Sequence, residues 1–307
     1  MLIEEISKLD RTIIRNLYCN SDKFNPFYFI IQNKVKMETL KIKKKGKFLS
    51  GDLHTHTIYS DGMNNIDSLV LEAKKRGLDV IAVTDHELTK ININMKRKLY
   101  SKHFSSCKKC AFEYAITVIP GLELASTEGH ILALFATYEV PKEVSKIINN
   151  LSPEETVEHI HEAGGVAIAA HLYRKTGLRN KVLKIRQKID GIELNSPYMW
   201  DKLDISENLG VAEIAGSDTH SRIGVGSAFT LFPYENYSLT IRDRKLELLI
   251  EFIRKKKTKA HFISSSDLLR NLDKTRWLSI FYAIKNTIGF FNDEHRVLSR
   301  KIERILL

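Results

Sequence analysis

Hydrophobic positions along the middle of the chain follow two periodicities. Short runs rich in Val, Ile and Ala are typical of buried strands, and they alternate with stretches whose apolar residues recur at helical spacing. Ile66, Leu69, Val70 and Ala73, for example, keep the i, i+3, i+4, i+7 spacing of an amphipathic helix, and a new apolar run begins shortly after Gly77. Strands that alternate with helices in this way predict parallel β-α units and therefore an α/β fold.

Metal-type side chains recur at the ends of these predicted strands. The strand-like segments 79–84, 116–121, 131–135, 165–170 and 213–217 adjoin, respectively, Asp85 with His86, Glu123, His130, His171, and Asp218 with His220. In a β/α barrel the carboxyl ends of the strands meet at one mouth, where catalytic residues collect. We therefore expect side chains from distant parts of the sequence to form one cluster.

The segment Gly51–Gly62 carries the most informative pattern. It joins His54 and His56 to Asp61 directly after a strand-like start. Residues i and i+2 of a strand point to the same face, so both imidazoles can reach one point while Asp61 returns from the following turn. Imidazole and carboxylate are ligands that zinc, iron and manganese accept. The segment therefore predicts a metal site at the end of a strand.

A second His-x-His pair shows that spacing alone is not enough. The eleven histidines among 307 residues would give about 0.4 such pairs by chance. His159 and His161 lie in the segment Pro153–Gly164, which is typical of a helix that ends at a glycine cap. Because residues i and i+2 of a helix do not face each other, we interpret this second pair as ordinary helix residues.

Taken in order, the motifs resemble those of the polymerase and histidinol phosphatase (PHP) family of metal-dependent phosphoesterases. The matching pieces are Asp52-x-His54-x-His56 with Ser60-Asp61-Gly62, Thr84-Asp85-His86, Gly121-Leu122-Glu123, Gly129-His130, Ala170-His171 and Gly216-Ser217-Asp218-Thr219-His220. The resemblance implies an α/β fold, a distorted (β/α)7 TIM-like barrel. We place it at residues 48–265, with residues 1–47 as a basic N-terminal extension or cap and residues 266–307 as a C-terminal helical tail.

The resemblance also implies a site for two or three divalent metal ions, which would be manganese, zinc or iron. Within it, Glu123 resembles the carboxylate that bridges two metals, and Asp61 is similar to its counterpart in small phosphatases that act on nucleotide phosphates. One departure is Leu172, where the family often has proline. Nine positions match the family's metal ligands: His54, His56, Asp61, His86, Glu123, His130, His171, Asp218 and His220.

Several residues beside the predicted ligands are candidates for catalytic support. We expect Asp52 and Asp85 to accept hydrogen bonds from ligand imidazoles, with capping or turn formation as the alternative. Arg174, Lys175 and Arg222 are expected to bind a substrate phosphate, unless they are solvated loop cations. Of these three, Arg222 is also a catalytic candidate.

Four further residues have two interpretations each. Glu193 and Asn195 share a strand face, where they would either line the mouth of the barrel or satisfy buried backbone groups. Tyr198 and Trp200 would either stack on a base or belong to the core. No protein nucleophile stands out.

Positive charge is concentrated at the two ends of the chain. The net charge is +11; residues 1–50 contribute 11 − 5 = +6, mostly from Lys41–Lys47, and residues 266–307 contribute 8 − 5 = +3. Such flanks would steer polyanions, including nucleic acid, towards a phosphoesterase mouth, or they would form a solvated lysine-rich face.

The cysteines and the hydropathy indicate an intracellular protein. Three cysteines do not make a disulfide framework, and Cys107 and Cys110 supply only half of a structural zinc motif, so we expect free thiols in a reducing cytoplasm. The chain has no apolar run long enough to span a membrane and no signal-peptide pattern.

The flanking segments have their own patterns. Phe27–Ile31 is typical of a strand, and the apolar residues between Trp277 and Phe291 form a helical stripe. We expect the stripe to be a buried packing face, with a membrane-surface or dimer contact as the alternative.

The residues together predict a cytoplasmic, metal-dependent phosphoesterase. In this interpretation hydroxide at the metal centre attacks the phosphorus of a small phosphomonoester, and nucleotide phosphates are the favoured substrates. Two alternatives remain: a nuclease that acts on RNA or DNA ends, and a non-catalytic barrel that binds nucleic acid or protein.

Overall fold

The computed structural model describes residues 26–46, 48–87, 93–143, 148–172, 174, 176–194, 209–234 and 244–262. The chain divides into two compact units, Met1–Lys34 with Ser265–Leu307, and Val35–Ser264. All described strands belong to the second unit. Lys175, Asn195, Tyr198, Trp200 and the C-terminal stripe lie outside the described residues.

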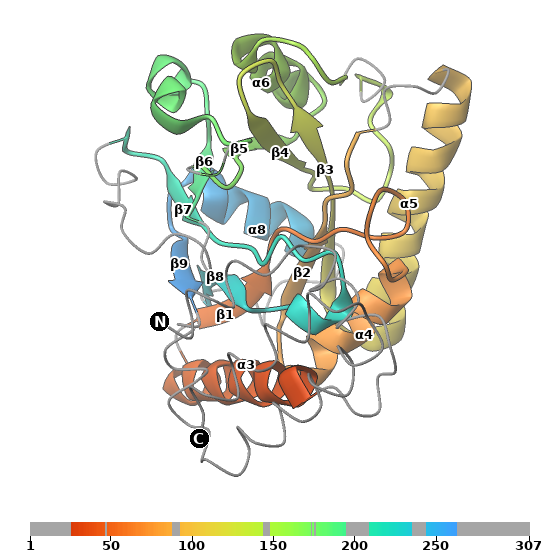
Figure 1. The fold of residues 1–307 in the computed structure, drawn as a ribbon, viewed down its shortest axis with the longest axis vertical. Helices are drawn as coiled ribbons and strands as arrows, with labels where there is room; N and C mark the ends of the chain where they lie inside the picture. Colours follow the sequence, from red (N-terminus) through yellow and green to blue (C-terminus); the bar gives the residue numbers. More distant parts are fainter. Residues whose placement is uncertain are drawn as a thin grey trace, which may run out of the picture. The chain divides into compact units, whose positions relative to one another are not determined.

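Nine strands form one sheet in the order β7-β6-β5-β4-β3-β2-β1-β8-β9 (Figure 1). The strands are β1 (Phe48–Asp52), β2 (Val80–Val83), β3 (Thr117–Ala125), β4 (His130–Leu134), β5 (Val166–Ala169), β6 (Gly191–Glu193), β7 (Ala212–Ile214), β8 (Ala228–Pro233) and β9 (Lys259–Phe262). The Thr230 hydroxyl of β8 bonds both the N–H and the carbonyl of Ala215, next to β7, at 2.9 Å each. The sheet is therefore a nearly closed barrel, which confirms the predicted TIM-like fold.

Helices occupy most of the described connections between the strands. They are α4 (Ile66–Lys75), α5 (Ile93–Tyr114), α6 (Pro153–Glu162), the 3-10 helices η2 (Arg179–Ile185) and η3 (Arg222–Gly224), and α8 (Lys245–Arg254). Helices α4 and α5 join parallel pairs, whereas β3 and β4 form an antiparallel hairpin without a helix. This reversal places His130, which begins β4, opposite Ala125 at the end of β3.

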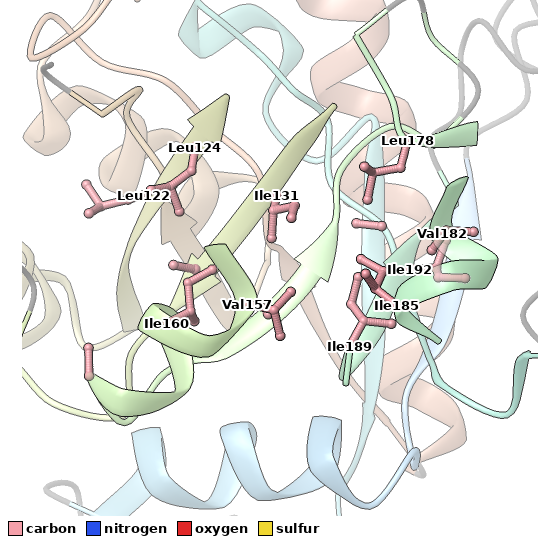
Figure 2. Packing of buried hydrophobic residues seen from close by; sticks show 14 of the residues in the cluster. Leu122, Leu124, Ile131, Val157, Ile160, Leu178, Val182, Ile185, Ile189 and Ile192 are labelled. Carbon is pink, nitrogen blue, oxygen red and sulfur yellow. The ribbon is translucent and has the colours of Figure 1, made fainter. Parts of the chain in front are cut away.

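Side-chain alternation along β3 separates the hydrophobic core from the site. Leu122 and Leu124 pack outwards in the cluster of Figure 2, where Val157 and Ile160 of α6 cover the sheet. Glu123 lies between them and therefore points to the opposite, inner face. A second apolar cluster joins α8, through Leu249 and its neighbours, to residues of the strands such as Leu132 and Ile168.

The predicted strand at Phe27–Ile31 is wrong, because these residues begin the helix α3 (Pro26–Lys45). Proline is favoured in the first turn of a helix, and its fixed φ suits that position. Further along α3, Val35 and Thr39 are buried at i, i+4 spacing, and the Thr39 hydroxyl donates to the carbonyl of Arg76 at 2.8 Å. Helical packing thus overrides the strand preference of an aromatic run.

No helix within the described ranges combines the length and apolar character needed to cross a membrane.

A buried arginine ties α4 to the loop that follows the site. Arg76 is fully buried; its Nε donates to Glu72 at 2.6 Å, and its Nη1 donates to the carbonyls of Ile223 and Val225 at 2.9 and 2.5 Å. Two of these acceptors are carbonyls of the η3 segment, which comes directly after His220. Arg76 therefore fixes the backbone beside the predicted ligands.

We predict that Arg76→Met lowers the free energy of unfolding by about 3–5 kcal/mol, because it removes the guanidinium that pairs with the buried Glu72 carboxylate. Urea denaturation measures the change. The matched control, Arg76→Met combined with Glu72→Leu, should recover part of the loss. A single variant as stable as the wild type would show that the arginine does not hold this region.

Candidate metal centre

Four ligand atoms from three parts of the sequence enclose one point. The Nε2 atoms of His54 and His56, just beyond β1, are 3.0 Å apart. Glu123 Oε2 lies 3.4 and 3.3 Å from these two nitrogens, and Asp218 Oδ1 lies 3.4 and 3.2 Å from them. Ligands bound tetrahedrally at zinc-like distances are separated by about 3.3 Å. The four atoms therefore have the spacing of ligands around a single ion.

A second group lies beside the first and shares His56. Asp61 Oδ1 is 3.8 Å from His56 Nδ1, while Asp61 Oδ2 is 3.7 Å from His86 Nε2 and 3.1 Å from His220 Nε2. All four ligand atoms lie within 4.8 Å of one another. This looser group is more exposed, which leaves it open to a substrate.

A third group shares Glu123 with the first. Glu123 Oε1 lies 2.8 Å from His130 Nδ1 and 2.9 Å from His171 Nε2, while Oε2 faces His54 and His56. One carboxylate thus presents each oxygen to a different group. The three groups together contain all nine residues that the sequence predicts as ligands.

Unpaired buried nitrogens support a metal at this cluster. Nδ1 of both His56 and His171 is buried without a hydrogen-bond partner among the described residues. Burying polar atoms unpaired is costly, so an ion that bound such nitrogens would stabilise the cluster. The donor set of nitrogen and carboxylate oxygen fits divalent zinc, manganese or iron.

Protonation within the cluster follows from burial and charge. Burial alone would lower the pKa of His54, but the carboxylates of Glu193 and Glu123 raise it to about 10. Burial would raise the pKa of Glu123, whereas the surrounding imidazoles, His54 foremost, hold it well below its usual range. Burial lowers the pKa of His171, which favours the neutral imidazole that a metal requires.

Backbone pairing beyond the strands brings the ligands together. The segment after β1 pairs with the segment after β7. The N–H of His56 donates to the carbonyl of Thr219 at 2.9 Å, and the N–H of Asp218 donates to the carbonyl of His54 at 2.9 Å. Gly216 is required here, because a Cβ would lie 2.4 Å from the Cβ of His54. His171 and Asp218 have φ of 27° and 49°, an uncommon conformation for residues other than glycine that tends to occur at functional sites.

Asp52 and Asp85 contact other groups than those predicted. Asp52 accepts from the Ser217 hydroxyl at 2.7 Å and from the Gly226 N–H at 2.7 Å, so it joins β1 to the loops after β7 and η3. Asp85 accepts from the N–H and hydroxyl of Thr57 at 2.7 Å each and from Ser60 at 2.6 Å. Neither carboxylate bonds the imidazole of a predicted ligand in the described structure. Both fix the backbone that carries those ligands.

The predicted phosphate-binding cations are placed differently from one another. Arg174 Nη1 is paired with Asp218 Oδ2, so its guanidinium lies at the edge of the first group. The backbone N–H of Arg222 donates to Asn64 at 2.9 Å, which anchors η3 near the start of α4. Lys175 lies outside the described residues.

The structure defines the contacts of two supporting residues: Glu193, which the sequence offered as lining the mouth or satisfying buried backbone groups, and His103. Both oxygens of Glu193 lie 3.0 Å from His54 Nδ1, and Oε2 accepts from the His171 N–H at 2.8 Å. A single carboxylate in an apolar strand was the sequence signal for it. His103, buried in α5, lies 3.4 Å from Asp85, and its position in a long helix gave no signal.

Two other sequence patterns lie away from the cluster. His159 and His161 are in α6, where His161 pairs with Asp190 at 2.7 Å. Cys107 and Cys110 are free, buried cysteines on α5. Burial and the nearby Asp67 raise the pKa of Cys110 to about 11, and burial raises that of Cys107 well above its usual value.

Sequence comparisons point to one family. The model of the PHP domain matches residues 52–195. The uncharacterized protein MJ1587 of Methanocaldococcus jannaschii is 32% identical over 166 residues, which is 50% of this chain and 85% of that protein. MJ0417 of the same organism is 26% identical over 265 residues, covering 82% of this chain and 98% of that protein.

Two solved structures share the fold. One is a two-domain protein from Bacteroides vulgatus that contains a predicted PHP-like metal-dependent phosphoesterase; it has a TM-score of 0.54 and 22% identity, and the match covers 73% of this chain and 69% of that one. The other is PsfC from Pseudomonas syringae, with a TM-score of 0.54, 19% identity, and 77% and 98% coverage. At these identities the likeness concerns the barrel architecture.

We predict that Glu193→Gln weakens divalent-metal binding by about 10–100-fold, because partners that orient a ligand imidazole and raise its basicity contribute on that scale. Isothermal titration with Mn²⁺ measures the affinity. Glu213→Gln, on the neighbouring strand β7, is the matched control and should bind like the wild type. Equal affinity in both variants would contradict a role for Glu193 at His54.

We predict that native Cys107 and Cys110 react with iodoacetamide at pH 8 about 100-fold more slowly than in the unfolded chain, because their raised pKa values leave little thiolate. The rate should increase as pH rises towards 11. Mass spectrometry of a Cys19→Ser variant, with guanidinium-unfolded protein as the reference, gives both rates. Rapid labelling of the folded protein at pH 8 would contradict the prediction.

Proposed function

We propose that this chain, which belongs to the PHP-domain family, is a metal-dependent hydrolase of phosphomonoesters. The observation that carries the proposal is the set of three adjacent ligand groups joined by His56 and Glu123. The Bacteroides vulgatus relative in fold, named as PHP-like and metal-dependent, supports the same reaction class. A binding module has no evident need for nine such side chains in one cluster.

The ligand groups would have different roles at the cluster. His54, His56, Glu123 and Asp218 form the closed group, and the group around Asp61 is more open to substrate. When bound, divalent ions make hydroxide available near neutral pH and neutralise phosphate charge. The nine side chains would hold those ions, and their carboxylates would limit repulsion between them.

Arg174 would contribute a positive charge of the protein itself. Its guanidinium pairs with Asp218 Oδ2, and its side chain remains 30% exposed. Guanidinium groups bind phosphate oxygens through charge-assisted hydrogen bonds. We propose that Arg174 orients a substrate phosphate at the edge of the metal cluster. Small nucleotide phosphates are the substrate class we favour. The free, buried thiols of α5 suit a reducing compartment such as the cytoplasm.

A nuclease acting on nucleic-acid ends is the second candidate. The last turn of α3 contains Lys43, Lys44 and Lys45, and Lys41 precedes them on the same helix. Such a basic segment would attract a polynucleotide. The products separate the two functions: a phosphatase releases only inorganic phosphate, whereas a nuclease shortens oligonucleotides.

We predict metal-dependent release of phosphate from nucleotide monophosphates. His56→Ala and Asp218→Ala should each lower turnover by more than about 100-fold. Removing a metal ligand should cost more activity than removing a residue that only hydrogen-bonds a ligand. A malachite-green assay with Mn²⁺, Zn²⁺ and Fe²⁺ added separately measures turnover, and circular dichroism checks the fold.

His161→Ala is the matched control, because His161 lies on the surface of α6 and should not affect turnover. Wild-type activity in His56→Ala, with contaminating metal excluded, would overturn the proposed site. Oligonucleotides incubated with the wild type under the same metal conditions and shortened on a denaturing gel would favour the nuclease.

A further inference from the structure

A cavity of about 380 Å³ lies beside the loop that carries Asp61. Its walls come from that loop, from the first turn of α4 and from α5, which contact each other in this part of the unit (Figure 1). Cavities of roughly 300–1,000 Å³ are the usual size of small-molecule sites. None of the nine predicted metal ligands lines it.

The apolar wall is held in place by the metal loop. Ile58 is 60% exposed although it is a large hydrophobic residue, and Tyr59 beside it packs edge-on against His103. The Asp85 carboxylate fixes Thr57 and Ser60, the residues on either side. Because these hydrogen bonds fix the loop, the side chain of Ile58 stays exposed at the cavity.

The wall is close to the metal cluster along the chain. Only Ser60 separates Tyr59 from Asp61, so the Cα atoms of these two residues are at most about 7.3 Å apart. Asp61 is itself 3.1 Å from His220. A phosphoester whose phosphate is at the cluster can therefore extend its alcohol part towards Ile58 and Tyr59.

The opposite wall carries positive charge. Lys102, Ser106 and Lys109 follow i, i+4, i+7 spacing, so they share one face of α5, and all three line the cavity. No ion pair joins either lysine to a carboxylate within the part of the chain that the structure describes. The one acidic residue of the lining, Asp67, accepts a hydrogen bond from Tyr114 at 2.8 Å. Two lysines against one aspartate leave a net charge of 2 − 1 = +1.

We infer that this cavity binds the alcohol part of the phosphoester, and that it selects a flat or apolar group carrying a second anion. The ring or chain would lie against Ile58, Tyr59 and Ile66, and the second anion would pair with Lys102 and Lys109. The inference rests on the proposed phosphomonoesterase function and adds the substrate feature that the pocket recognises.

A pair of aryl phosphates that differ in one charge tests this. 4-Carboxyphenyl phosphate and 4-carbamoylphenyl phosphate have the same shape, but only the first carries the remote anion. The wild type should show a KM about tenfold lower for the carboxylate ester, as expected for two exposed ion pairs. Lys102→Gln with Lys109→Gln should abolish this preference. Lys98→Gln with Lys108→Gln, exposed on the same helix, is the matched control and should keep the preference.

Equal KM values for both esters in the wild type, or an unchanged preference in the Lys102 and Lys109 variant, would overturn the inference. If the wild type hydrolyses neither ester, that result counts against the proposed function and not against the pocket. The pocket is then tested by measuring the binding of substrate analogues. Calorimetry with 4-carboxybenzylphosphonate and 4-carbamoylbenzylphosphonate should still show tighter binding of the carboxylate, lost in the same double variant. Equal affinities would reject the pocket as well.

Discussion

The buried carboxylate of Glu123 is the constraint on which the site depends. It sits on the inner face of β3, with His130 and His171 at one oxygen and His54 and His56 at the other. A charge taken out of water must be compensated by partners at close range. In this barrel the compensation comes from imidazoles at the ends of three different strands, β1, β4 and β5, so the fold and the site require each other.

A ring of backbone anchors around the cluster keeps the ligands in register. Asp52 and Asp85 each accept several hydrogen bonds from loops, and Glu193 bonds His54 and the backbone of His171. Rigid placement matters because metal ligands must meet within a few tenths of an ångström.

The arrangement also explains why recognition of a substrate would fall to one side of the mouth. The segment that follows β1 has a predicted metal ligand at each end, His56 and Asp61, and between them it exposes Ile58. Helix α5 faces this loop with lysines on one side and buries His103 and Cys107 on the other. In the proposed function, this loop would lie between a phosphate at the metal cluster and the group attached to that phosphate.

Much of this could be predicted from the sequence, because strand alternation and the His-x-His, Asp and Glu motifs are local. Strand ends that meet at one mouth predict a cluster of these side chains, and the resemblance to the PHP family supplied the barrel and the set of nine positions. Only the tertiary structure decided the partners of Asp52, Asp85 and Glu193, the role of His103, and the helical state of residues 27–31. Those outcomes depend on contacts between residues far apart in the chain, and no local spacing encodes which buried donor a carboxylate will meet.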